Sequence, residues 1–322
     1  MYIDVFNGDA DGICSLLQLR LANAIDSVLV TGVKRDIALL QRVNARVGDH
    51  VSVLDISMDK NRSSLMALLE QGVEVFYADH HQASEVPKHP KLRALIDTDA
   101  NICTSLLIDR YLNHRYTAWA VTGAFGDNLH ASAFQAAESL KLSQLELDQL
   151  SQLGLCINYN AYGEHVEDLH IAPDRLYRQL SGFASPFEFI AESVDLYQSL
   201  LEAYHSDMAL TDPINPEFDN GQVAVFVLPN EKWARRVSGV WSNALANANP
   251  AKAHAVLNLT ASGDYQVSVR APLLYKTGAD ELCMRFPTGG GRKAAAGINH
   301  LPSKDLLQFI NALASQYAQI AQ

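Results

Sequence analysis

The sequence predicts an α/β protein with an N-terminal doubly wound parallel sheet and a smaller α/β domain after it. From residue 1 to about 130, short β-branched apolar runs alternate with amphipathic stretches, as in βαβ units. Three of these runs end in acidic residues. A chain of 322 residues also exceeds the usual size of a single core. We therefore expect two domains, with a ligand site beyond the carboxyl ends of the first sheet.

The elements of the first part follow from hydrophobic periodicity. Apolar runs predict strands at 2–6, 27–31, 51–54, 73–78 and 92–96. Between them, helical spacing predicts helices at 13–24 and 58–71, the second ended by Gly72. Residues 132 to about 208 have a helical pattern, with 187–205 as one long connecting helix. Asp212-Pro213 should stop it, because proline ends helices.

The second part begins after a stretch rich in proline and asparagine. We place the first domain with its helical extension at 1–210, a linker at 211–221 and the second domain at 222–322. The second domain is predicted to contain strands at 223–227, 254–259 and 265–269, and helices at 234–246 and 305–320. Its distinctive feature is the sequence GGGRKAAAG at 289–297.

Composition indicates which kinds of binding partner and which cellular compartment to expect. The net charge of −11 disfavours long nucleic acid as a stable partner, whereas a short phosphorylated substrate is compatible because bound cations reverse the local charge. The N-terminus lacks a signal-peptide pattern, and no apolar run approaches a membrane span. Four scattered cysteines indicate reduced thiols. We expect a cytoplasmic monomer or homodimer without a membrane partner.

Carboxylates and imidazoles follow three of the predicted strands. Asp9 and Asp11 come after the first strand, Asp55 after the third, and His80 and His81 after the fourth. Neighbouring carboxylates can hold two cations a few Å apart. Adjacent histidines after an apolar strand have no packing rationale, and imidazole is the commonest nitrogen ligand of such metals. This pattern predicts a metal-assisted hydrolase.

Simpler interpretations of the acids remain open. Asp9 and Asp11 with Gly12 could form an acidic turn, and Asp55 alone could be a helix N-cap. Asp127 is a further candidate, because neighbouring glycines let the backbone bring a carboxylate close to an ion.

In the second domain, three glycines directly precede two positively charged residues. Gly289, Gly290 and Gly291 precede Arg292 and Lys293, so backbone amides and positive charge could converge on an anion. A plain flexible loop is the alternative.

Other residues are candidates from their place in the chain. Arg270 ends a predicted strand and could face the same site or simply solvent. Trp233 lies near a helix start and could stack on a base, worth roughly 1–3 kcal/mol, or belong to the core or a lid. Lys34, Arg35 and His130 follow strands or acidic motifs and could border the site.

The motifs together resemble a known family. Residues 7–15 (NGDADGICS), 54–55 (LD), 79–81 (DHH) and 126–127 (GD) resemble in order the four motifs of DHH-family phosphoesterases. Residues 289–297 are similar to the GGGHxxAAG signature of the DHHA1 domain found in one branch of that family. The resemblance extends over most of the chain and implies a phosphodiesterase with two Mn(II) ions that activate a bridging hydroxide. It implies Asp9 as a ligand of the first ion, Asp11, His80 and Asp127 of the second, and Asp55 as a bridge.

The resemblance also assigns supporting residues, with two departures. His81 would lie beside the ligands or touch the phosphate, and Asp79 would orient an imidazole. Where relatives have His or Asp in the first motif, this chain has Asn7, a neutral and weaker ligand. Arg292 replaces the usual His of the second signature, and its planar fork suits phosphate.

The predicted reaction is hydrolysis of very short oligonucleotides, or linear dinucleotides such as pGpG, to 5'-mononucleotides. The chain length and the negative charge favour the short-substrate branch of the family. The alternatives are a phosphatase acting on 3',5'-bisphosphorylated nucleoside (pAp), a cyclic-dinucleotide phosphodiesterase, and a nucleotide-binding sensor that has lost catalysis, with Asn7 as the first sign of decay.

Overall fold

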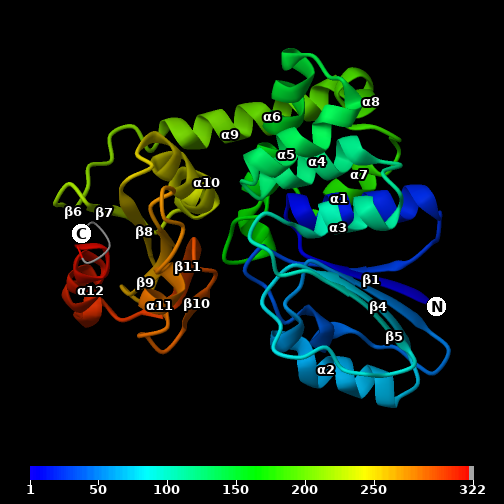
Figure 1. Cartoon of the computed structure of the whole chain (residues 1–322). Coiled ribbons are helices and arrows are strands. Elements are labelled where there is room, and N and C mark those ends of the chain that lie inside the picture. Colours follow the sequence, from blue (N-terminus) through cyan, green and yellow to red (C-terminus); the bar gives the residue numbers. More distant parts are fainter. Residues whose placement is uncertain (319–322) are drawn as a thin grey trace. The chain divides into compact units, whose positions relative to one another are not determined.

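The computed structural model describes residues 1–318, which form two compact units (Figure 1). The first unit is Met1–Ala203, and the second begins at Tyr204. The linker at 211–221 stays a prediction. Within residues 1–318, no helix is long and apolar enough to cross a membrane.

The first unit is built on a parallel sheet of five strands. Its strands are β1 (Tyr2–Phe6), β2 (Val28–Val30), β3 (His50–Leu54), β4 (Glu74–Asp79) and β5 (Leu92–Ile96). They lie in the order β2-β1-β3-β4-β5, and every pairing is parallel. The predicted strands and the predicted fold class are confirmed, because apolar β-branched runs fill a sheet covered on both faces.

The sheet order places the switch point beside β1. The chain passes from β1 outward to β2 and then returns to β3 on the other side of β1. The segments that follow β1 and β3 therefore leave in different directions and open a crevice at their carboxyl ends, where ligands bind in this class of fold.

Helices cover both faces of this sheet (Figure 1). Those of the first unit are α1 (Ala10–Ala22), α2 (Met58–Glu70), α3 (Thr104–Tyr111), α4 (Thr117–Gly126), α5 (His130–Ala137), α6 (Gln144–Asn160), α7 (Pro173–Leu180) and α8 (Pro186–Glu192), with 3-10 turns at Leu39–Arg42, Glu138–Leu140 and Val166–Asp168. On one face α2 packs against the sheet, and on the opposite face α1 packs against α3 and α4. Figure 1 shows this sandwich of helix, sheet and helix layers.

The predicted single helix at 187–205 is wrong. The structure has α8 and then α9 (Val194–Ala209), separated at Ser193. Ser193 has φ −113° and ψ 48°, outside the helical region. Serine is tolerated at such breaks because its hydroxyl competes for backbone partners. The helix α9 ends at Ala209, three residues before Asp212.

The second unit contains a mixed sheet of six strands. These are β6 (Phe218–Asp219), β7 (Val223–Leu228), β8 (Ala253–Leu259), β9 (Tyr265–Arg270), β10 (Gly289–Gly291) and β11 (Ala295–Leu301), in the order β10-β11-β9-β8-β7-β6. Among the described strands of this second sheet, only β7 and β8 pair in parallel. The helices are α10 (Lys232–Ala248), α11 (Ala279–Cys283) and α12 (Leu306–Ala318), with a 3-10 turn at Ser303–Asp305. The predicted end of the last helix, at 320, lies outside the described residues.

The glycine-rich segment forms an antiparallel hairpin that the sequence did not predict. Gly289–Gly291 is the edge strand β10, paired with β11. A Cβ on Gly289 would lie 1.8 Å from the carbonyl oxygen of Cys283, and one on Gly291, at φ 146°, would lie 2.4 Å from the Cα of Ala296. Close packing therefore requires glycine at both positions.

Candidate metal centre

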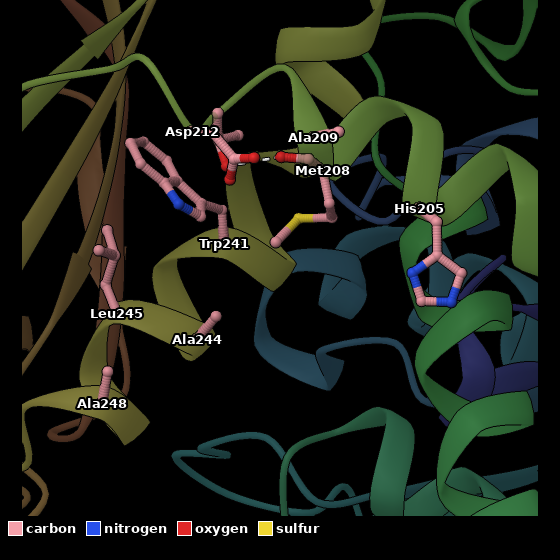
Figure 2. A pocket seen from close by; sticks show the side chains of 9 residues that line it. His205, Met208, Ala209, Asp212, Trp241, Ala244, Leu245 and Ala248 are labelled. Carbon is pink, nitrogen blue, oxygen red and sulfur yellow. Dashed lines mark hydrogen bonds between the residues drawn. The ribbon is translucent and has the colours of Figure 1, made fainter.

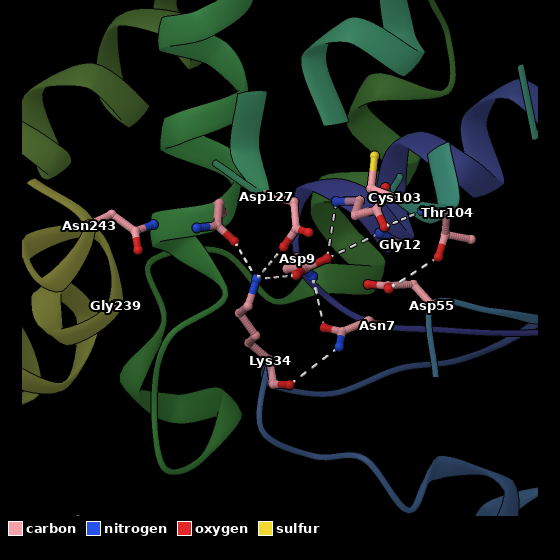
Figure 3. Close-up of polar contacts among 12 residues, drawn as sticks. Asn7, Asp9, Gly12, Lys34, Asp55, Cys103, Thr104, Asp127, Gly239 and Asn243 are labelled. Carbon is pink, nitrogen blue, oxygen red and sulfur yellow. Dashed lines mark hydrogen bonds and ion pairs between the residues drawn. The ribbon is translucent and has the colours of Figure 1, made fainter. Parts of the chain in front are cut away.

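Acidic side chains and one imidazole gather at the carboxyl edge of the parallel sheet. Asp9 and Asp11 begin α1 after β1, Asp55 follows β3, and His80 follows β4. All four residues are at most 4% exposed. Asp127, at the end of α4, faces the same space (Figure 3). Residues up to 118 positions apart, such as Asp9 and Asp127, thus meet in one cluster.

Asp11 is held by the first turn of α3. Its Oδ2 accepts the backbone N–H of Thr104 and its Oδ1 that of Ser105, both at 2.7 Å. The amide dipoles of a helix N-terminus stabilise such a carboxylate. Sequence reasoning missed Thr104, whose hydroxyl also donates to Asp55 Oδ1 at 3.2 Å.

Asp55 has an unusual backbone conformation at the switch point. Its φ is 58°, in the left-handed region that aspartate and asparagine tolerate better than other non-glycine residues. Its N–H donates to the carbonyl of Ala78 at 3.0 Å, which anchors the turn to β4. Burial raises the pKa of Asp55 well above its usual range, and the charges of Asp11 and Asp9 raise it further. A bound cation would relieve this repulsion.

His80 directs its second ring nitrogen into the cluster. Its Nδ1 lies 2.7 Å from the carbonyl oxygen of Ile102, so Nδ1 carries the proton and donates it. Its Nε2 lies 3.4 Å from Asp55 Oδ1 and 3.9 Å from both Asp11 Oδ2 and Asp127 Oδ2. Ligands about 2.1 Å from one ion lie about 3 to 4 Å from each other. These four side chains therefore fit a single divalent cation.

Asp79 and His81 form a second acid–imidazole pair beside this group. Asp79, the last residue of β4, is fully buried, and its Oδ1 accepts from His81 Nδ1 at 2.7 Å. Burial opposes ionisation of Asp79, but the charge and hydrogen bond of His81 outweigh it and lower the pKa of Asp79. Burial likewise opposes the charge on His81, and Asp79 more than compensates and raises the pKa of His81. The imidazole that Asp79 orients is thus that of His81.

His81 reaches both the cluster and solvent. Its side chain is 33% exposed, and its Nδ1 lies 3.8 Å from Asp55 Oδ1. Ligand atoms of Asp55, His80 and His81 all lie within 4.8 Å of one another. His81 is therefore placed to touch a substrate at the edge of the cluster.

Glycines bring Asp127 to the cluster through helix contacts. A Cβ on Gly126 would lie 2.3 Å from the Cβ of Ala10 and 2.7 Å from the carbonyl oxygen of Gly154. The end of α4 can thus touch both α1 and α6 only because residue 126 has no side chain. Asp127 is the residue that follows this contact.

Asn7, Asp9 and Lys34 form a separate corner of the cluster (Figure 3). Asn7 Nδ2 donates to the carbonyl of Lys34 at 3.3 Å, and its Oδ1 accepts the N–H of Asp9 at 3.2 Å. Lys34 Nζ lies 2.5 Å from Asp9 Oδ2 and 2.8 Å from Asn158 Oδ1. Burial lowers the pKa of Lys34, but Asp9, Tyr162 and Asp127 together raise it above its ordinary value. No sequence signal pointed to Asn158, which lies 124 residues from Lys34.

The candidates of the second unit lie at the end of β9, in β10 and the β10–β11 turn, and at the start of α10. Arg270 is half-buried, with Nε donating to Asn243 Oδ1 at 2.6 Å, so it supports α10. Arg292 lies in the turn and donates its backbone N–H to Ala295, which pairs with Arg270 across the sheet. Lys293 is exposed, and Trp233 is half-buried in the first turn of α10. The N–H of Gly289 donates to Phe286, so that amide already has a partner within the fold.

An open hollow of about 440 Å³ lies elsewhere in the second unit (Figure 2). Its walls come from the end of α9, the residues after it, and α10. It is lined by His205, Met208, Ala209, Thr211, Asp212, Trp241, Ala244, Leu245 and Ala248. None of the predicted site residues lines this hollow.

A doubly wound parallel sheet followed by a mixed-sheet unit is also the fold of solved structures of the exonuclease RecJ and of a pGpG-specific phosphodiesterase. RecJ from Thermus thermophilus in complex with Mn²⁺ is similar over 99% of this chain and 52% of its own, with a TM-score of 0.65 and 18% identity. A pGpG-specific phosphodiesterase, PggH from Vibrio cholerae, is similar over 99% of both chains, with a TM-score of 0.54 and 12% identity. The chain thus spans about half the length of the Thermus RecJ.

A second RecJ structure has the same fold, but no protein-family model or curated protein matches the sequence. That RecJ structure, bound to manganese, covers 98% of this chain and 90% of its own, with a TM-score of 0.50 and 18% identity. The fold expected from the sequence motifs is confirmed, while identities this low leave the activity to be argued from the site.

Proposed function

We propose that this chain is a metal-dependent phosphodiesterase that releases 5'-mononucleotides from very short oligonucleotides or linear dinucleotides such as pGpG. The observation that carries the proposal is the buried group of Asp11, Asp55, His80 and Asp127 at the switch point of the sheet. The similarity to PggH over 99% of both chains supports a short substrate. The net charge of −11 also disfavours long nucleic acid as a stable partner.

The donor set favours Mn(II). Carboxylate oxygens with one imidazole suit this ion. Asp11, Asp55, His80 and Asp127 would hold it. When bound, such an ion polarises a phosphoryl oxygen and lowers the pKa of a water molecule to about 7.

The residues around the cluster have roles that follow from their hydrogen bonds. Ile102 fixes the proton of His80 on Nδ1 and keeps Nε2 available as a donor atom for the ion. Asp79 holds His81 and favours its charged form. A protonated His81 at the exposed edge can hydrogen-bond a phosphate oxygen or give a proton to the leaving oxygen.

The candidate substrate-binding residues belong to the second unit. Arg292 and Lys293 in the β10–β11 turn would contact phosphate, and Trp233 would stack on a base. Arg270 would act mainly by holding α10 in place, because its Nε donates to Asn243. Holding one nucleotide in this way would fix the point of cleavage and penalise long chains.

A nucleotide-binding sensor without catalysis is the second candidate function. The observation that favours it is the ion pair between Lys34 and Asp9, together with a neutral Asn7 in the first motif. Against it, the side chains of Asp11, Asp55, His80 and Asp127 all remain in place.

Nucleotide release from a defined panel tests the proposal. The panel contains ribo- and deoxyribo-oligomers of increasing length, pGpG, pAp and cyclic dinucleotides, each with Mn(II), Mg(II) or EDTA. We expect Mn-dependent release that falls with length and is lost in Asp55→Ala and His80→Ala, whereas Asp195→Ala, exposed on α9, keeps it. Nucleotide binding that persists in EDTA without any turnover would establish the sensor instead. Turnover of pAp alone would establish a phosphatase.

A further inference from the structure

Lys34 packs against the acidic cluster with most of its side chain out of solvent. Its Nζ contacts Asp9 Oδ2 at 2.5 Å, Asn158 Oδ1 at 2.8 Å and Asp127 Oδ1 at 3.6 Å (Figure 3). It also lies 5.6 Å from the ring centroid of Tyr162, and its side chain is only 22% exposed. The ammonium group therefore has polar partners on several sides.

The backbone at Lys34 is fixed independently of these contacts. Its N–H donates to the carbonyl of Ala161 at 2.8 Å, just after α6, and its carbonyl accepts from Asn7 at 3.3 Å. Close packing supports the same arrangement, because a Cβ on Gly8 would lie 2.1 Å from the carbonyl oxygen of Gly32. The loop after β2 is thus tied to the first motif on one side and to α6 on the other.

The residues that would hold a first metal ion already have partners. Asp9 Oδ1 accepts the N–H groups of Asp11 and Gly12 at 3.0 and 3.1 Å, and Asp9 Oδ2 accepts from Lys34. The amide of Asn7 is hydrogen-bonded at both ends, to Lys34 and to Asp9. A cation bound to Asp9 would have to displace a charged side chain.

Asp127 lies between the two parts of the cluster. Its Oδ1 is 3.6 Å from Lys34 Nζ, while its Oδ2 is 3.9 Å from His80 Nε2. One oxygen of the Asp127 carboxylate therefore faces the Lys34 ammonium. The other oxygen faces the group of Asp11, Asp55 and His80. The ammonium thus stands where a positive charge touches both Asp9 and Asp127.

From these contacts we propose that Lys34 replaces one of the two metal ions, so that the chain binds a single divalent cation beside a built-in ammonium group. The inference rests on the metal-binding part of the proposed function. Lys34 acts as a positioning residue: it neutralises Asp9 and holds Asp127 toward His80. It also accounts for Asn7, because a site filled by an ammonium needs no strong metal ligand in the first motif.

Metal counting on the full chain tests this inference without reference to activity. The protein is stripped with EDTA, dialysed against Mn(II), and analysed for bound manganese and by electron paramagnetic resonance. We expect one Mn(II) per chain, with the spectrum of an isolated ion. Two ions with a spin-coupled spectrum would overturn the inference and leave the proposed function standing. The absence of any bound ion would contradict both.

A double variant should bind two metal ions where the wild type binds one. Lys34→Met combined with Asn7→His removes the ammonium and supplies an imidazole, and we expect it to bind two ions. The control is Lys91→Met, whose ammonium donates to the carbonyl of Gly72 away from the cluster and which should bind one. Lys34→Gln combined with Asn7→His serves if the first variant does not fold. A folded double variant that still binds one ion would show that Lys34 does not exclude the second.

Discussion

Replacing Asp55 with asparagine should stabilise the metal-free protein. Asp55 is 2% exposed and lies with Asp11 and Asp9 in a group whose mutual repulsion, added to burial, raises its pKa. Asparagine removes one negative charge, keeps an oxygen that can accept from Thr104, and tolerates the φ of 58°. Relief of a poorly compensated buried group is worth about 1–3 kcal/mol. We expect Asp55→Asn to raise the free energy of unfolding by that amount in EDTA at pH 7.

The pH dependence of this effect has a definite sign. Because the folded-state pKa of Asp55 lies above its unfolded value, the folded protein binds more protons between the two values. The metal-free wild type should therefore lose stability as the pH rises from about 4 through the raised pKa. Asp55→Asn should lack this loss, so the two proteins should differ little at low pH and most at neutral pH.

Urea unfolding followed by circular dichroism measures both effects. Asp55→Ala is the matched variant, because alanine also removes the charge but costs about 1–2 kcal/mol in the left-handed region. With Mn(II) the wild type should become more stable than Asp55→Asn. A ligand at 100 times its dissociation constant stabilises the wild type by about 2.7 kcal/mol. If Asp55→Asn is less stable than the wild type in EDTA, the repulsion inferred for this cluster is refuted.

Two further predictions concern the neighbouring imidazole and the helix contacts. Asp79→Asn removes the partner that raises the pKa of His81, so the NMR-measured pKa should fall and activity should be lost at a lower pH than in the wild type; an unchanged pKa would mean that Asp79 does not control His81. Gly126→Ala should destabilise the protein by about 1–3 kcal/mol, because its Cβ would lie 2.3 Å from that of Ala10. The control is Gly182→Ala, where no atom lies within 4 Å of the added Cβ, and equal effects on thermal unfolding would contradict the packing argument.

The parts of the fold that follow from local physical chemistry were predictable. The strands β1, β3 and β4 are apolar runs, and the acids that end or follow them meet because parallel strands share a carboxyl edge. The helix α1 begins three residues before its predicted start, because the Asp9 carboxylate accepts from Asp11 and Gly12 and caps the helix.

The parts that depend on contacts across the chain were not predictable. Gly289–Gly291 gave no strand signal, because glycine has no side chain to show alternation. The break at Ser193 falls inside one continuous helical pattern, so periodicity did not mark it. The role of Lys34 requires α6 to bring Asn158 beside it, and nothing near residue 34 encodes that contact. The sequence thus predicted the acids of the cluster and Lys34 as a residue that could border them, but not the ion pairs of Lys34 with Asp9 and Asp127.

The most direct test of the proposed function is the rate of pGpG cleavage by the full chain with Mn(II), compared with EDTA and with His80→Ala. We predict turnover that requires the ion, falls with substrate length, and drops more than about 100-fold in the variant, because loss of a partner that merely supports a ligand already costs 10–100-fold. Cleavage that survives both EDTA and His80→Ala would place the chemistry outside this cluster and contradict the proposal.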